Sequence, residues 1–231
     1  MKSKILKNKN SRRGEILKYF LDLLKGFLAG VMIAIGGTVY LMVESKVIGA
    51  ILFVIGLFII VVNELNLFTG KIGYIINYSN SYLVEVILTL VGNFLGTLLV
   101  GSALLCTRIS PVLNEKALKL VETKLTDNGW SIFILAIFCG ILMYLAVNGY
   151  KTIKDSLGKY LAVFLGVSVF ILSGFEHCVA NMYYFTVARA WSIYSLTFML
   201  IMILGNAVGA ILFSFSEKIY KNIKVDKKTK E

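Results

Sequence analysis

Residues 174–181 read GFEHCVAN and interrupt an apolar run that extends from residue 160 to residue 188. The run is long enough to cross a bilayer, whose hydrocarbon core takes ~20 apolar residues of helix. It nevertheless contains Glu176, His177 and Asn181. Ionisable side chains at membrane depth are rare and usually functional, and irregular backbone there must line a cavity or be buried in protein. The stretch therefore predicts a transmembrane helix that is broken beside a polar pathway.

A second apolar run is interrupted in a similar way, by the sequence ELNLFTGK at residues 64–71. Glu64 and Asn66 stand in this run much as Glu176 and Asn181 stand in the later one. We expect the two acidic residues to occupy corresponding places and to support the two breaks, together with the two amides. The shared pattern predicts an internal repeat.

A Gly-Asn pair follows each break at nearly the same spacing, with Asn93 after the first break and Asn206 after the second. An amide inside a membrane needs hydrogen-bond partners. We therefore expect these two side chains to have a structural role and to support the broken helices.

Apolar runs of membrane-spanning length lie at residues 19–43, 47–79, 83–107, 130–148, 160–188 and 191–215. Each half of the chain then has three passages, and an odd number means that the second half inserts upside down relative to the first. The prediction is an all-α integral membrane protein of six transmembrane helices in two inverted three-helix repeats. The transmembrane domain covers residues 19–215, its repeats are 19–107 and 130–215, and its second and fifth helices are broken.

The composition agrees with a membrane protein, because 58% of the residues are hydrophobic and 16% are charged. A net charge of +11 could indicate a nucleic-acid partner. However, the Lys and Arg residues gather in segments 1–18 and 216–231 and in the loop at 151–159, and excess basic residues mark the cytoplasmic side. We expect a multi-pass protein of the cell membrane with both termini cytoplasmic, an outer linker at 108–129, and no nucleic-acid partner.

The three cysteines, Cys106, Cys139 and Cys178, are odd in number, widely spaced and set in apolar runs. Their spacing matches neither a disulfide framework nor a metal site. We expect all three to be small buried apolar residues, and we expect no metal and no cofactor.

Residues 175–182 closely resemble the break in the fifth helix of the formate/nitrite transporter family, and residues 67–70 resemble that family's loop in the second helix. The Gly-Asn pairs at Asn93 and Asn206 are similar to its third and sixth helices. The resemblance covers essentially the whole chain in the right order. It implies an aquaporin-like fold, a homopentamer with one pore per protomer, and a small monovalent anion as cargo. The Asn-Pro-Ala motifs of aquaporins are missing, and the only proline is Pro111, so water is not the expected cargo.

Within the family, the sequence looks most like the clostridial hydrosulfide channels, which implies HS⁻ as the cargo, with formate or nitrite as the alternatives. The pore centre is expected at His177, whose imidazole can donate a hydrogen bond to an anion, and at Thr69, where the family places a hydroxyl. Lys124 matches a family lysine in the outer vestibule, where it would attract anions. Apolar constrictions flanking His177 are expected at Leu57, Leu67, Phe68, Met143 and Phe170, with Phe53 as a further lining residue.

The pair of Glu176 and His177 also allows a different reading, in which a membrane enzyme uses them as acid and base. That reading lacks a second histidine, a metal cluster and a nucleophile in register. Symmetric breaks in both halves are also unnecessary for an enzyme, so we predict a transport protein. In such a protein Glu176 would repel an anion, and we expect it to accept hydrogen bonds from freed backbone N–H groups instead.

Overall fold

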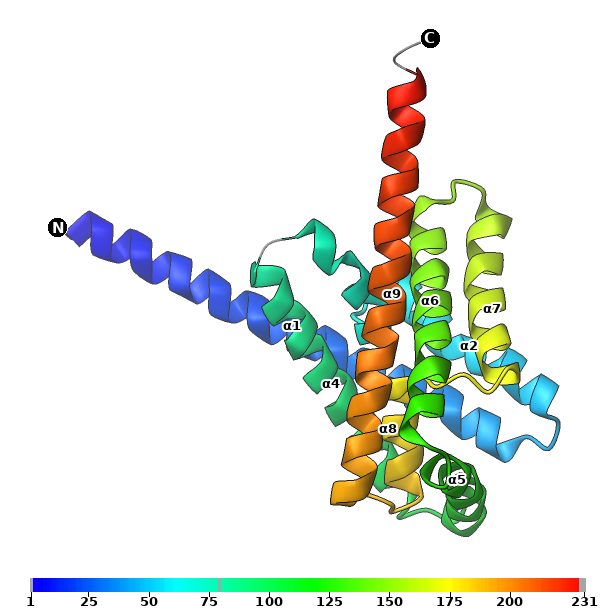
Figure 1. Ribbon diagram of the computed structural model, residues 1–231. Coiled ribbons are helices and arrows are strands. Elements are labelled where there is room, and N and C mark those ends of the chain that lie inside the picture. Colours follow the sequence, from blue (N-terminus) through cyan, green and yellow to red (C-terminus); the bar gives the residue numbers. More distant parts are fainter. Residues whose placement is uncertain (1, 79, 229–231) are drawn as a thin grey trace.

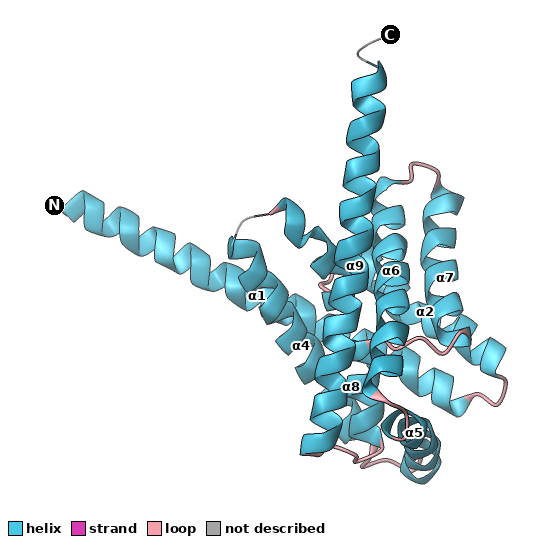
Figure 2. Cartoon of the chain, viewed as in Figure 1, coloured by secondary structure: helices cyan, strands magenta, loops and turns pink. Residues whose placement is uncertain are grey.

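The computed structural model describes residues 2–78 and 80–228, and the side chains of residues 14–78 and 80–223. All regular elements in this part of the chain are helices (Figure 2). The elements are α1 (Lys2–Met42), α2 (Lys46–Val62), α3 (Phe68–Lys71), the 3-10 helix η1 (Ile72–Asn77), α4 (Asn80–Leu104), α5 (Ser110–Leu125), α6 (Gly129–Thr152), α7 (Ser156–Leu172), α8 (Cys178–Val187) and α9 (Ile193–Lys228). The basic side chains of residues 1–13 and 224–230, which contribute to the predicted cytoplasmic charge, lie outside the described side chains.

Four stretches are long and apolar enough to cross a membrane without a break, namely Gly14–Met42, Asn80–Leu104, Gly129–Thr152 and Ile193–Ile223. Helices α2 and α7 are apolar but shorter, at 17 residues each. Each is followed, after five residues of non-helical chain, by a second helix, α3 or α8. The second and fifth predicted passages are thus interrupted where the sequence indicated.

The two halves of the chain repeat the same order of elements. Helix α1 packs along α4, and α6 packs along α9 in the same way, while α2 contacts α7 across the halves (Figure 1). Glycine permits the close approach within each pair, because a Cβ added at Gly30 or at Gly140 would overlap the backbone of the facing helix. The atoms it would meet belong to Asn93 and to Asn206, so a close helix contact lies beside each of the two predicted amides.

Both breaks begin with the same backbone turn. The residue two positions after each helix end has a left-handed backbone, with φ 53° at Glu64 and 71° at Gly174. The next amide then bonds back to the helix, from Leu65 N–H to Ile60 O and from Phe175 N–H to Phe170 O, both at 2.9 Å. For a residue other than glycine this conformation costs about 1–2 kcal/mol. Glu64 therefore ends a helix at a position that glycine fits better.

Asn93 holds the first break with three hydrogen bonds and is fully buried on α4. Its Oδ1 accepts a hydrogen bond at 2.9 Å from the N–H of Phe68, and Phe68 is the first residue of α3. Its Nδ2 donates to the carbonyl oxygens of Asn66 at 2.9 Å and Gly26 at 2.8 Å. One amide thus satisfies a helix start, the broken segment and α1 together, which buried backbone groups require.

Asn206 holds the second break in the same manner from α9. Its Oδ1 accepts the N–H of Cys178 at 2.9 Å, and its Nδ2 donates at 2.7 Å to the carbonyl oxygens of Glu176 and Ala136. The structural role expected for both asparagines agrees with these contacts.

These hydrogen bonds correct the register that the sequence pattern indicated. Asn66 corresponds to Glu176, because each accepts a bond from the bracing asparagine through its carbonyl oxygen. Glu64 corresponds to Gly174 and not to Glu176. The sequence pattern matched the acidic residues by charge. The repeat is instead defined by backbone carbonyl oxygens that accept from the bracing asparagines, and any residue type supplies such an oxygen.

Three further features were not expected. The predicted linker 108–129 contains α5, which packs against α8 (Figure 1). The predicted basic end segments are continuous with α1 and α9 as far as the structure describes them. Cys106 is exposed, while Cys139 and Cys178 are buried. The prediction of three buried cysteines is therefore wrong for Cys106, because it lies in the turns that follow α4.

Candidate functional site

His177 is the last residue of the non-helical segment between α7 and α8 and is the N-cap of α8. Its Nδ1 accepts a hydrogen bond from Ala180 N–H at 3.0 Å, and its Nε2 lies 2.9 Å from Thr69 Oγ1. A backbone N–H can only donate, so Nδ1 carries no proton in this arrangement and the ring proton lies on Nε2. The imidazole is therefore oriented as a donor toward Thr69, and the two predicted residues of the pore centre meet between the two breaks.

Glu176 is buried next to His177 and is bound by two side chains. Lys124 Nζ lies 2.6 Å and 2.8 Å from its two carboxylate oxygens, and Asn181 Nδ2 donates to Oε2 at 2.7 Å. The expectation that Glu176 accepts freed backbone N–H groups is wrong, since the N–H of Cys178 bonds to Asn206 instead. Lys124, which was expected to attract anions in the outer vestibule, is the counterion of this carboxylate, so much of its charge is offset locally.

A small cavity of about 100 Å³ lies on the α8 side of His177. Its lining residues include Tyr40, Lys124, Phe170, His177, Asn181 and Tyr184. The Oδ1 atom of Asn181 is buried and has no hydrogen-bond partner among the described residues. An unused acceptor thus belongs to a residue of the cavity wall, which also includes four aromatic residues and two lysines.

A larger cavity of about 410 Å³ lies on the α3 side and includes Leu67 and Gly70 among its lining residues. Lys25, Lys71 and Lys151 also line it, together with Glu64. Lys25 and Lys151 form no ion pair with any carboxylate whose side chain the structure describes. The cavity wall therefore carries more positive than negative charge.

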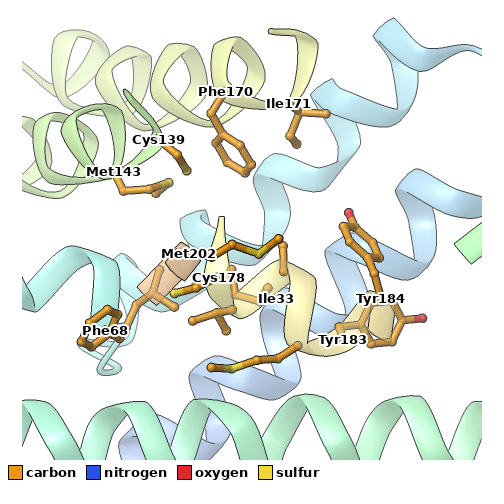
Figure 3. Packing of buried hydrophobic residues seen from close by; sticks show 14 of the residues in the cluster. Ile33, Phe68, Cys139, Met143, Phe170, Ile171, Cys178, Tyr183, Tyr184 and Met202 are labelled. Carbon is orange, nitrogen blue, oxygen red and sulfur yellow. The ribbon is translucent and has the colours of Figure 1, made fainter. Parts of the chain in front are cut away.

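The predicted constriction residues are all buried, with exposed fractions of 4% or less. Phe170 stacks on the His177 ring, with centroids 5.4 Å apart, and Phe53 meets Phe170 edge to face at 5.9 Å. Figure 3 shows Phe68, Met143 and Phe170 in one apolar cluster with Cys139 and Cys178. Phe170 lines the α8-side cavity and Leu67 the α3-side cavity, whereas Leu57, Phe68, Met143 and Phe53 line neither. Side chains therefore fill the region between the cavities.

The sequence pattern did not single out the three lysines of the α3-side cavity. Lys71 lies in the quoted stretch 64–71, and its position at membrane depth was a usable signal. Its partner Glu85 lies within α4. Lys151 was counted among the basic residues at the ends of passages, whereas Lys25 lies inside the predicted passage 19–43 and was overlooked.

Apolar helices that break in matching places, meet at buried polar side chains and leave a cavity on each side of that meeting point define a membrane transport protein of the inverted-repeat class. The chain belongs to the formate/nitrite transporter family, whose family model matches residues 7–217. It is a multi-pass membrane protein and not an enzyme.

Two relatives illustrate the match. The chain is 28% identical over 211 residues to the uncharacterized transporter YrhG of Bacillus subtilis, which covers 82% of this chain and 77% of that protein. It is 26% identical over 189 residues to the formate channel FocA of Haemophilus influenzae, covering 71% and 65%.

The fold is shared with solved structures. A pentameric formate channel with formate bound has a TM-score of 0.75 at 22% identity and covers 90% of this chain and 98% of its own. An ion channel of the same family has a TM-score of 0.73 at 21% identity, with coverage of 91% and 92%.

Proposed function

We propose that this protein conducts small monovalent anions of weak acids along a path from one cavity to the other, past the Thr69–His177 contact. The observation that carries the proposal is the 2.9 Å contact between His177 Nε2 and Thr69 Oγ1, which joins the two breaks between the two cavities. An anion that enters this contact can receive the Nε2–H and the hydroxyl hydrogen as two hydrogen bonds. Hydrogen bonds to a charged acceptor are stronger than neutral ones.

The surroundings favour a weak acid. Removing water from an anion in an apolar passage is costly. The buried side chains Leu57, Leu67, Phe68, Met143, Phe170 and Phe53 are the proposed lining of two such constrictions. An anion that gains a proton on the way avoids much of this cost, which a permanently charged ion such as chloride cannot do.

Hydrosulfide is the cargo we propose first. HS⁻ accepts hydrogen bonds from His177 and Thr69 and still carries one hydrogen. The acceptor we propose for it is Asn181 Oδ1, which is buried beside the 100 Å³ cavity and has no hydrogen-bond partner among the described residues. Formate and nitrite, which have no N–H, O–H or S–H hydrogen as anions, would leave that oxygen unpaired. They remain the alternative cargoes, and the formate channels among the relatives support formate.

The assembly we propose is a homopentamer with one pathway in each protomer and with both termini in the cytoplasm. A pentameric structural relative supports the first part, and the basic residues Lys151, Lys154 and Lys159 beside the basic ends support the second. Conductance of mixed pentamers should fall in proportion to the fraction of subunits blocked at His177. Loss of all conductance from one blocked subunit would mean that the pathway is shared on the axis or that gating is concerted, and the proposed place of the site would need revision.

Flux measurements in proteoliposomes test the cargo. Purified protein is reconstituted, and initial rates are compared for hydrosulfide, formate, nitrite and chloride at equal concentration and pH, with protein-free liposomes as the baseline. We expect hydrosulfide and formate to exceed chloride, with hydrosulfide fastest. Equal rates for chloride would refute the weak-acid selectivity, and formate or nitrite above hydrosulfide would replace the first cargo with the alternative.

A further inference from the structure

Lys71 occupies the position in the first break that Asn181 occupies in the second. In both breaks the side chain at this position donates to the side chain five residues earlier. Lys71 Nζ lies 3.2 Å from Asn66 Oδ1, and Asn181 Nδ2 lies 2.7 Å from Glu176 Oε2. The repeat therefore preserves the hydrogen bond but changes which end is charged. In the first break the donor is charged and the acceptor is neutral, and in the second break the donor is neutral and the acceptor is charged.

In each break a further side chain, from a different helix, forms an ion pair with the charged end of this hydrogen bond. In the second break the carboxylate belongs to the broken segment, and Lys124 reaches it from α5. In the first break the lysine belongs to α3, and Glu85 reaches it from α4. Glu85 Oε2 also lies 3.4 Å from Lys18 Nζ. The first break thus places a cation, and the second a carboxylate, on the broken passage.

Lys71 stands between two cavities. It lines the 410 Å³ cavity with Leu67 and Gly70, and it also lines a neighbouring cavity of about 420 Å³. Glu85 lines only the neighbouring cavity. Asp22 extends the same network, with its Oδ1 3.5 Å from Asn66 Nδ2. An anion in the 410 Å³ cavity therefore meets Lys71 but not Glu85 on the cavity wall.

Apart from Lys71, the charged residues that line that cavity are two lysines and one carboxylate, Glu64, so Glu64 is the only negative group among them. Lys25 and Lys151 line the same cavity and add positive charge. Glu64 is exposed at the end of α2 and makes no ion pair among the described side chains. The principal negative partner of Lys71 is thus Glu85.

We propose that Lys71 is a second anion-binding residue of the pathway, on the face predicted to be cytoplasmic, and that Glu85 is its resident counterion, displaced from the lysine by an incoming anion. The inference rests on the proposed function of small-anion conduction. The exchange costs little, because one carboxylate partner of the lysine is replaced by another anion while Lys18 continues to compensate Glu85. Anion binding from this face is then a competition with Glu85 for a cation, whereas the equivalent Asn181 is a neutral donor that binds Glu176.

The test measures initial flux of formate and of hydrosulfide against concentration, in membrane vesicles of inside-out and right-side-out orientation. The variants are Lys71→Asn, which installs the residue of the other break, Lys71→Arg, which keeps the charge, Glu85→Gln, and the double variant. Lys119→Asn is the matched control, because Lys119 pairs with Glu115 on the exposed face of α5 and lines none of the cavities described above. Pentamer integrity is followed by size-exclusion chromatography.

From the Lys71 face, Lys71→Asn should raise the half-saturating anion concentration about tenfold, the size of one charge-assisted hydrogen bond. Glu85→Gln should lower it, and less so when Lys71 is already Asn. Lys71→Arg and Lys119→Asn should stay within about twofold of the wild type by the same scale, and entry from the opposite face should not change.

An unchanged half-saturation in intact pentamers of both Lys71→Asn and Glu85→Gln would overturn the inference. An equal change from both faces would also overturn it, because that outcome indicates general damage. A wild-type protein that conducts neither anion would overturn the proposed function itself, a result distinct from failure of the Lys71 variants alone.

Discussion

Replacing His177 with Asn separates the two tasks that the imidazole performs. The Asn amide reaches about as far as Nδ1 of imidazole and is a good N-cap, so the bond from Ala180 N–H is retained. It does not reach the place of Nε2, so the 2.9 Å contact with Thr69 and the donor to the anion are lost. Gln is the complementary variant, because its amide reaches the place of Nε2 but does not reproduce the cap.

The expected free-energy change differs between loss of the N-cap and loss of the hydrogen bond to the anion. Loss of an N-cap costs about 1 kcal/mol of stability, so Gln should lower the thermal midpoint of the pentamer and Asn should not. Loss of one hydrogen bond to a charged group costs about 1.5–3 kcal/mol, which corresponds to roughly a 10- to 100-fold slower flux. The His177→Asn variant should therefore have a low flux and a wild-type thermal midpoint. The His177→Gln variant should have a lower thermal midpoint but a higher flux than His177→Asn.

Both quantities are measurable on the same preparations. Initial hydrosulfide and formate flux in proteoliposomes reports the anion contact, and thermal unfolding followed by loss of the pentamer peak reports the cap. Flux of the Asn variant equal to wild type, with an intact pentamer, would refute the central role of His177. A thermal midpoint lowered equally by Asn and Gln would refute the assignment of Nδ1 to the cap.

Three further predictions follow from the buried contacts. Asn93→Ala and Asn206→Ala should each lower pentamer stability by about 1–3 kcal/mol for every buried partner left unpaired, measured by thermal unfolding; a neutral result at either site would contradict the equivalence of the two halves. Lys124→Met and Glu176→Gln should each destabilise by about 3–5 kcal/mol, since each leaves a buried partner uncompensated, and the double variant should recover much of the loss; additive losses in this cycle would show that the pair is not coupled. Gly140→Ala should prevent normal assembly, because its methyl group would overlap the backbone of Asn206, and a wild-type pentamer yield would show that α6 and α9 can separate.

The hydrophobic pattern and the positions of the interruptions were sufficient to predict the helical fold and the broken passages. Apolar runs of fixed length respond to one constraint, the thickness of the bilayer, so they can be read locally. Thr69 and His177 are 108 positions apart, and their meeting was predicted from the inverted repeat, which places both breaks around one pathway, together with the family resemblance. The roles of Asn93 and Asn206 were predictable for a local reason, since a buried amide must find partners.

The sequence by itself determined that the chain is an α-helical membrane protein with two similar halves, each interrupted once. Hydropathy and the polar interruptions of apolar runs are properties of neighbouring residues, so they can be read along the chain. Only the tertiary structure decided which residues of the halves correspond and which charges meet. Glu176 is matched with Asn66 and not with Glu64 because carbonyl geometry, not charge, sets the register. The partners Lys124–Glu176 and Lys71–Glu85 come from different helices. Their contacts arise from packing, which no local pattern in the chain encodes.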